Sequence, residues 1–210
     1  AGAVAPHVVA SAVGRINRGL GTPGALVEGG VQPGTGKLEG GAATSAEVLA
    51  LATDKDSAVP ALLDHLVGPI GPVCGAQLAL RFPETAGGEH ELPGTEWHTD
   101  GMRQGRQHPF SLLVGVALSS MPRPFVGNFG VFPGSHVILD RLLLANGRLR
   151  DVDEAEAFSA VAGKGDPWGR DAKLPDLGRC HQLLLEPGDV VVAHPKLAHR
   201  GCPNLSPHIR

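Results

Sequence analysis

The stretch GDVVVAHPKLAHRGCPNLSPHIR, residues 188–210, carries the clearest fold signal in this sequence. It opens with a short apolar run, 189–193, between Gly188 and Pro195, which is typical of a β-strand. Comparable runs bounded by Pro, Gly or Asn lie at 76–82, 111–118, 130–132 and 181–185. Many short strands separated by such residues are typical of a β-sandwich or barrel. We therefore predict a mainly β chain from residue 73 onward.

The N-terminal third predicts helices instead of strands. Amphipathic patterns cover three segments, 3–18, 45–53 and 57–66. The second and third open on Ser45 and Ser57, whose hydroxyls suit helix N-caps. The segment 19–41 is crowded with Gly and Pro, which indicates a surface loop.

We expect a single domain over 1–210, because a chain of 210 residues suits one core of this size. Within it, a helical portion at 1–72 packs on a β core at 73–210. Residues 139–145 indicate a brief helix. The polar stretch 146–179 shows no periodicity, and we expect it to form a lid or insert.

Composition excludes several classes of function. A net charge of −3 gives no basic excess, which argues against nucleic acid or an anionic membrane surface as the partner. No apolar run approaches the roughly 20 residues of a membrane-spanning helix. The three cysteines form neither a disulfide framework nor a CxxC pair. We expect a small-molecule substrate and an intracellular, cytoplasmic location. The start at Ala1 leaves targeting open, and the sequence does not determine the oligomeric state.

The segment Trp97-His98-Thr99-Asp100-Gly101 supplies two candidate metal ligands. Residues i and i+2 of a strand point to the same face, so His98 and Asp100 can reach one metal ion. An HxD motif also arises by chance about 0.5 times in a chain of this composition, so the motif needs a partner elsewhere.

The 188–210 stretch supplies that partner in His199, followed eleven residues later by Arg210. Two imidazoles and one carboxylate, with the other coordination positions open, form the facial triad that suits iron(II) and oxygen activation. The guanidinium of Arg210 can bind a carboxylate through two parallel hydrogen bonds. The three ligands and the arginine together predict a metal site beside a small-acid site.

Three ordered blocks of the sequence resemble one known family. They are WHTDG at 97–101, GNFGVFPGSH at 127–136 and the stretch at 188–210. Together they resemble the phytanoyl-CoA dioxygenase-like family of iron(II)/2-oxoglutarate oxygenases, over about 77–210. The resemblance implies a mainly β fold with flanking helices, a double-stranded β-helix of the cupin-like jelly-roll type.

The resemblance also assigns roles to residues. It implies iron ligation by His98, Asp100 and His199, and binding of the distal carboxylate of 2-oxoglutarate by Arg210. For the other carboxylate, the polar candidates upstream of the first ligand are Gln77 and Thr95.

Several positions depart from the family pattern or compete with it. Family members often carry a hydroxyl two residues after the distal histidine, whereas this chain has Gly201. His194 competes with His199, but its spacing of sixteen residues to Arg210 does not match the family, and Pro195 bends the chain away. His136 falls at a conformational corner of the family and is not assigned to the metal.

The resemblance implies a dioxygenase that uses iron(II), O₂ and 2-oxoglutarate to hydroxylate a small organic substrate, releasing succinate and CO₂. Asp100 favours hydroxylation, because related halogenating enzymes carry a small residue there. Two alternatives remain open: a non-catalytic jelly-roll protein that binds a metal or ligand, and a cupin-type metalloenzyme independent of 2-oxoglutarate. Arg210, a cation suited to binding a dicarboxylate, favours the 2-oxoglutarate-dependent dioxygenase over both alternatives.

Overall fold

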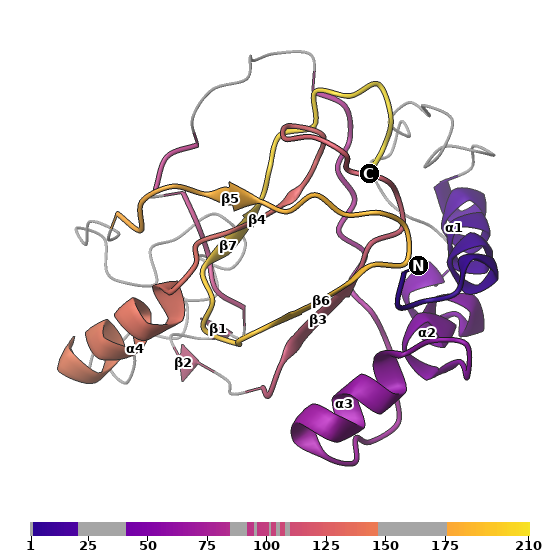
Figure 1. The fold of residues 1–210 in the computed structure, drawn as a ribbon, viewed down its shortest axis with the longest axis horizontal. Helices are drawn as coiled ribbons and strands as arrows, with labels where there is room; N and C mark the ends of the chain where they lie inside the picture. The colour runs from indigo at the N-terminus through magenta and orange to yellow at the C-terminus, as the bar shows by residue number, and fades with distance from the viewer. Residues whose placement is uncertain are drawn as a thin grey trace.

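The computed structural model describes residues 2–20, 41–84, 92–94, 96–100, 102–103, 106–107, 110–146 and 176–210. The N-terminal part is helical, with α1 (Pro6–Leu20), the short 3₁₀ helix η1 (Ala42–Thr44), α2 (Ala46–Thr53) and α3 (Val59–Val67). The strands are β1 (Met102–Arg103), β2 (Arg106–Gln107), β3 (Leu113–Val116), β4 (Phe129–Val131), β5 (His181–Gln182), β6 (Val190–Ala193) and β7 (His199–Gly201). The helix α4 (Ser135–Asn146) follows β4 and lies on the opposite side of the molecule from α1–α3 (Figure 1).

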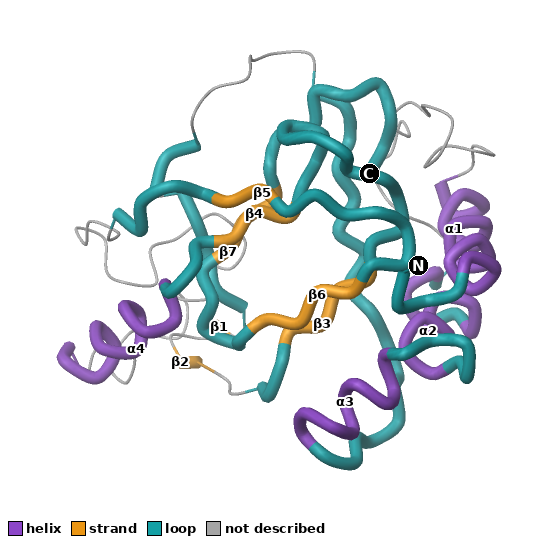
Figure 2. Tube along the Cα trace, viewed as in Figure 1, coloured by secondary structure: helices purple, strands orange, loops and turns teal. Residues whose placement is uncertain are grey.

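The described strands pair antiparallel in three small sheets. β1 pairs with β2, β3 pairs with β6, and β4 lies between β5 and β7. The β3–β6 pair and the β5–β4–β7 sheet lie on opposite sides of the centre of the molecule (Figure 2). Strands distant in sequence thus become neighbours, which brings 188–210 into contact with both sheets.

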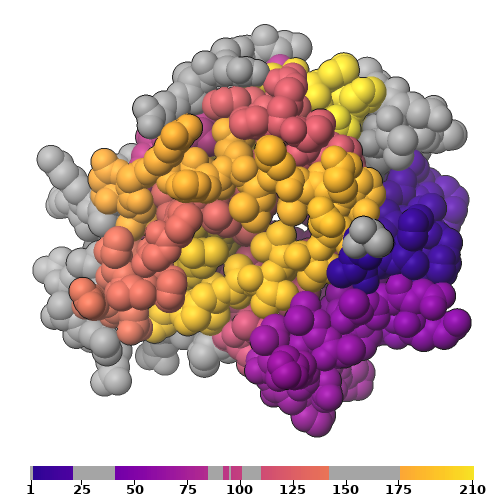
Figure 3. Space-filling view, in the orientation of Figure 1, coloured from indigo at the N-terminus to yellow at the C-terminus, as the bar shows by residue number. Residues whose placement is uncertain are grey.

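The N-terminal helices and the β3–β6 side share one hydrophobic core. In α1, buried residues recur every three or four positions, as in Val9, Ala12, Val13 and Ile16, so one face of the helix is apolar. Partly buried side chains of β3 and β6, including Val114 and Val190, pack against this core. The helices cover one side of the visible face in the space-filling view (Figure 3).

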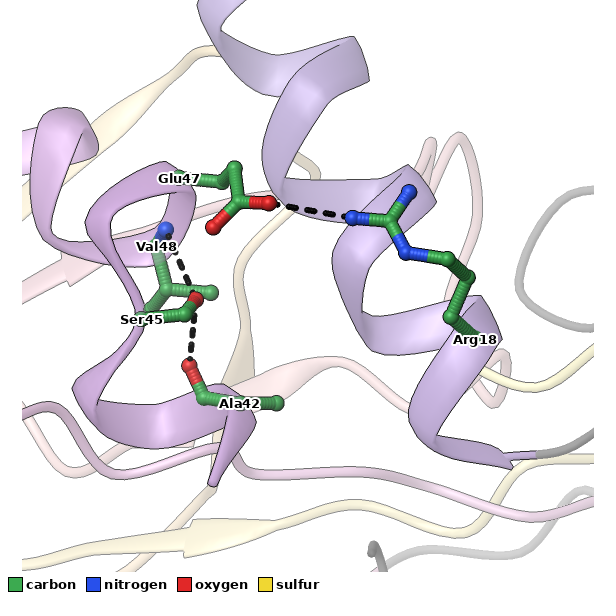
Figure 4. A network of polar contacts seen from close by, with 5 residues as sticks. All are labelled: Arg18, Ala42, Ser45, Glu47 and Val48. Carbon is green, nitrogen blue, oxygen red and sulfur yellow. Dashed lines mark hydrogen bonds and ion pairs between the residues drawn. The ribbon is translucent and has the colours of Figure 1, made fainter. Parts of the chain in front are cut away.

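Two serines act near helix starts as their chemistry predicts, although only one is the cap itself. The hydroxyl of Ser45 accepts a hydrogen bond from the Val48 amide at 3.4 Å, so the predicted N-cap of α2 is confirmed (Figure 4). Ser57 lies further from its helix, because α3 begins at Val59 and Ala58 is the boundary residue. Its hydroxyl still accepts a hydrogen bond from the Val59 amide.

A second apolar cluster lies beneath α4 and the segment before the HxD motif. Its buried members are Leu92, Phe132, Leu139, Cys180, Ala198 and Cys202, and Trp97 packs against them. This cluster anchors the residue immediately before each predicted histidine ligand, because Trp97 precedes His98 and Ala198 precedes His199. None of the helices in the described residues has the length and apolar content needed to cross a membrane.

The predicted strand at 76–82 is wrong as a regular strand. Within this segment, Arg81 exchanges two backbone hydrogen bonds with Arg210. The side chains of Leu78, Leu80 and Phe82 pack toward the helical core. Past this pair the regular pattern stops, because Pro83 has no amide proton and the Glu84 amide donates to the Asn204 carbonyl at 2.8 Å. The helix predicted at 139–145 begins earlier, at Ser135. Most of the predicted lid at 146–179 lies outside the described residues.

Candidate metal centre

His98 and His199 come from segments far apart in the chain and are joined through their backbones. The His98 amide donates to the His199 carbonyl at 3.0 Å, and the His199 amide donates to the His98 carbonyl at 2.9 Å. Residues that exchange both hydrogen bonds lie directly opposite each other with side chains on the same face. Accordingly, the two imidazole rings lie 4.4 Å apart between centroids, inclined at 60°.

Asp100 completes a group of three on this face. One carboxylate oxygen, Oδ2, lies 3.5 Å from His199 Nε2, and the other, Oδ1, lies 4.0 Å from His98 Nε2. One donor atom from each of the three residues lies within 4.8 Å of the other two. Two neutral imidazoles and a carboxylate at this separation fit one divalent transition metal ion such as iron(II).

The ring of His199 is held so that one nitrogen faces the site. Its Nδ1 lies 2.8 Å from the Leu197 carbonyl oxygen, which can only accept a hydrogen bond. The proton therefore belongs on Nδ1, and Nε2 is left with a free lone pair directed toward Asp100 and His98. The residue is also buried, at 5% exposed, so packing restricts its rotation.

The local electrostatics favour the protonation states that bind a metal. Burial, followed by the nearby His199, lowers the pKa of His98, and the charges of Arg81 and Arg200 act in the same direction. The adjacent His199 side chain lowers the pKa of Asp100 despite an opposing effect of burial. At neutral pH His98 is therefore neutral and Asp100 is ionised, as metal ligation requires.

The family model of phytanoyl-CoA dioxygenase (PhyH) matches residues 31–210. The chain belongs to this family. PhyH proteins have a cupin-like jelly-roll fold and are oxygenases of the iron/2-oxoglutarate type, and the antiparallel sheets with flanking helices agree with that fold. The match begins well before the region of the sequence resemblance and includes α2 and α3. A search of curated proteins gave no match.

Arg210, the residue that the PhyH resemblance assigns to the co-substrate, is half-buried in the structure. Burial lowers the pKa of its guanidinium from the usual value, although the group stays protonated at neutral pH. Its Nε is buried and has no hydrogen-bond partner in the described part of the chain. A buried donor without a partner is unusual in a folded protein, and a bound ligand is one way to satisfy it.

Gln77 and Thr95 were predicted to bind the other carboxylate of the PhyH co-substrate. Gln77 is exposed and forms no hydrogen bond with another described residue. Thr95 lies outside the described residues. Arg81 was not predicted from the sequence as a site residue, yet its guanidinium occupies the place that a Cβ on Gly201 would take. The sequence signal that could have identified Arg81 is the alternation of apolar and other residues over 76–82. In an extended segment, Arg81 points to the same side as Gln77.

The competing histidines lie elsewhere than in the group of three. His194 contacts His136, with 4.9 Å between ring centroids, and its Nδ1 accepts a hydrogen bond from the Lys196 amide. His136 is the second residue of α4 and lies outside the group of three. A second group of possible ligand atoms, His7, Asp54 and Asp56, lies on the surface near the N-terminal helices. Exposed acidic clusters of this kind are common without an ion.

Proposed function

We propose that this chain is an iron(II)- and 2-oxoglutarate-dependent dioxygenase that hydroxylates a small organic substrate within a double-stranded β-helix. The supporting observation is the group of donor atoms from His98, Asp100 and His199, with one donor atom of each residue within 4.8 Å of the other two. Membership of the PhyH family supports the class of reaction. In this reaction 2-oxoglutarate is converted to succinate and CO₂ while one oxygen atom enters a C–H bond of the substrate.

We propose that His98, Asp100 and His199 hold the iron, and that Arg210 binds the distal carboxylate of 2-oxoglutarate. Bound iron would supply the activation of O₂, which no side chain of the protein can provide. The protein contributes orientation: the reciprocal backbone bonds fix the two histidines relative to each other, and the Leu197 carbonyl selects the ligating nitrogen of His199. The positive charge of Arg210 attracts a dicarboxylate in preference to a monocarboxylate.

The test is formation of succinate from 2-oxoglutarate by protein loaded with iron(II) under anaerobic conditions and then exposed to oxygen. Enzymes of this class turn over 2-oxoglutarate slowly without their main substrate, so that substrate need not be known. We expect succinate to form with the wild type and to be lost in His199→Ala. The matched control is His194→Asn, which removes a nearby imidazole outside the group of three but keeps a side-chain acceptor for the Lys196 amide.

The outcomes separate the proposal from its rivals. Iron-dependent succinate that persists in His194→Asn and disappears in His199→Ala supports the dioxygenase. An unchanged rate in His199→Ala contradicts the assignment of the ligands. If the wild type neither forms succinate nor changes its iron absorbance or melting temperature on addition of 2-oxoglutarate, a non-catalytic binding protein becomes the better description.

A further inference from the structure

Arg81 and Arg210 are direct backbone partners. The Arg81 amide donates to the Arg210 carbonyl at 2.5 Å, and the Arg210 amide donates to the Arg81 carbonyl at 2.8 Å. Residues that exchange both bonds project their side chains side by side from the same face. A Cβ built on Gly127 would lie 3.0 Å from the Cβ of Arg81 and 3.1 Å from that of Arg210, so the two arginine side chains begin next to each other.

The far end of Arg81 lies over Gly201. Its guanidinium occupies the place that a Cβ on Gly201 would take, so only glycine at this position leaves the room. Gly201 follows His199 by two residues on β7, and alternate residues of a strand share a face. The guanidinium of Arg81 is therefore on the same side of β7 as the proposed metal ligand His199.

Two arginine side chains that begin next to each other on one face can both reach a single carboxylate. In the described part of the chain, neither Arg81 nor Arg210 forms an ion pair with an acidic side chain. The Nε of Arg210 is buried without a hydrogen-bond partner. A carboxylate held by both groups balances their positive charge and accepts the unused hydrogen bond of the Arg210 Nε.

We propose that Arg81 is a second carboxylate-binding residue, which shares the distal carboxylate of the 2-oxo dicarboxylate with Arg210. In this chain its guanidinium takes the place of the hydroxyl that PhyH proteins often carry two residues after the distal histidine. The side-by-side origin of the two arginines places Arg81 at the distal end of the ligand, away from the end that chelates the metal. This inference rests on the proposed function, because it concerns the same co-substrate.

The test compares two 2-oxo acids of equal chain length. 2-Oxoglutarate carries the distal carboxylate, and 2-oxopentanoate carries a methyl group in its place. Dissociation constants are measured with anaerobic, iron(II)-loaded protein, by the absorbance change on chelation and independently by calorimetry. The variants are Arg81→Gln, which removes the charge, and Arg81→Lys, which keeps the charge but loses the planar fork.

We expect Arg81→Gln to raise the dissociation constant of 2-oxoglutarate by roughly 10- to 100-fold, as for loss of a charge-assisted hydrogen bond. The dissociation constant of 2-oxopentanoate stays within about twofold of the wild type, because that ligand has no distal charge. Arg81→Lys lies between the wild type and Arg81→Gln. Equal weakening of both ligands, or no weakening of either, overturns the proposal.

The charge control is Arg200→Gln. Arg200 precedes Gly201 on β7, and its charge also acts on His98, but its guanidinium pairs with Glu96 at 2.7 Å. We expect this variant to keep the preference for 2-oxoglutarate over 2-oxopentanoate. A loss equal to that of Arg81→Gln means that general positive charge, and not a contact of Arg81, sets the preference, and this overturns the proposal.

A swap of residues tests the role of Gly201. In Gly201→Ser the new side chain must displace the guanidinium of Arg81, which is the far end of a flexible side chain, so the fold is kept while 2-oxoglutarate binding weakens. In the double variant Arg81→Ala with Gly201→Ser, the serine hydroxyl takes over the contact. Binding should recover relative to Arg81→Ala alone, and an absence of recovery contradicts the shared place of the two groups.

The wild-type measurement separates this inference from the proposed function. If the wild type does not bind 2-oxoglutarate, the co-substrate assignment fails, and the role of Arg81 fails with it. If the wild type binds 2-oxoglutarate and Arg81→Gln binds it equally well, the dioxygenase proposal stands and only the role of Arg81 is overturned.

Discussion

The turn before His199 is anchored at each step, and this explains why one histidine faces the site and the other does not. His194 uses its Nδ1 to accept a hydrogen bond from the Lys196 amide, and the Leu197 amide donates to the His194 carbonyl at 2.9 Å. The Ala198 amide then donates to the Ser135 hydroxyl at 2.9 Å. His194 therefore stabilises the turn, and His199 enters β7 in a fixed orientation.

The lowered pKa of His98 predicts how the stability of the metal-free protein depends on pH. The unfolded chain protonates His98 near pH 6.5, whereas the folded chain, in which burial is the main cause of the shift, protonates it only at lower pH. Between these two values the unfolded state binds more protons, so the free energy of unfolding falls as the pH drops below about 6.5.

Urea unfolding in the presence of a chelator, at a series of pH values, measures this effect. We expect wild-type protein to lose more stability than His98→Gln as the pH falls from 7 toward 5, because the variant has no imidazole to protonate. Parallel pH profiles for the two proteins contradict the assignment. The other histidines are common to both proteins and cancel in the comparison.

The sequence alone predicted best those site residues whose roles follow from their spacing in the chain. The spacing of His98 and Asp100 and the position of His199 predicted three residues that the structure brings together. The guanidinium of Arg81 lies over Gly201 because the backbone of Arg81 pairs with that of Arg210, far away in sequence, and no local pattern reveals such a pairing. Gln77 was chosen by polarity and proximity in sequence, and neither determines where an exposed side chain points.

At the scale of single elements, β4 is shaped by a residue without a side chain. Gly130 pairs with Gln182 of β5 and with Arg200 of β7. A Cβ on Gly130 would lie only 2.6 Å from the sulfur of Cys180 and 2.6 Å from that of Cys202. The two buried thiols therefore fill the volume above the central strand.

Gly130→Ala should destabilise the protein by about 1–3 kcal/mol, because overpacking in a filled core displaces its neighbours. The matched control is Gly115→Ala in β3, where an added Cβ meets nothing within 4 Å. Since alanine also reduces the entropy of the unfolded chain, the control should be neutral or slightly stabilising. Chemical unfolding of the three proteins decides the matter, and equal stabilities would contradict the packing described for β4.

The short strands were predicted better than their pairing. The runs at 111–118, 130–132, 181–185 and 189–193 overlap β3, β4, β5 and β6, because apolar residues and turn residues act locally. The run at 76–82 has the same composition, yet a regular strand needs a partner over its length. Among the described residues its backbone is paired at isolated points, from the Ala76 amide to the Ala43 carbonyl and at Arg81 with Arg210. Whether a segment finds a strand to pair with depends on the whole fold, and this cannot be predicted from the sequence of that segment alone.

At the scale of the whole molecule, α1 belongs to the core although it precedes the PhyH match. The match begins at residue 31, whereas α1 ends at Leu20. Ile16 of α1 is fully buried at 0% exposed, in the same apolar cluster as residues of α2 and α3. The helices and the β3–β6 side therefore unfold together, as expected of a shared core.

Ile16→Ala tests this coupling. Loss of a fully buried isoleucine should reduce the free energy of unfolding by about 2–5 kcal/mol. The control is Val137→Ala in α4, where the side chain is 44% exposed and the cost should be within about 0.5 kcal/mol. A single transition shifted only by the first substitution supports one cooperative unit. A separate early transition for α1, with the rest of the protein unchanged, would refute it.

The reciprocal backbone bonds between His98 and His199 also set the order of events during synthesis. The two histidines are separated by about half of the 210 residues, so the segment that carries His199 must be synthesised before they can meet. A nascent chain that has exposed His98 and Asp100 still lacks the third ligand. If these residues hold iron as proposed, loading waits until β7 has docked, and a partly made protein does not present the complete set of proposed ligands.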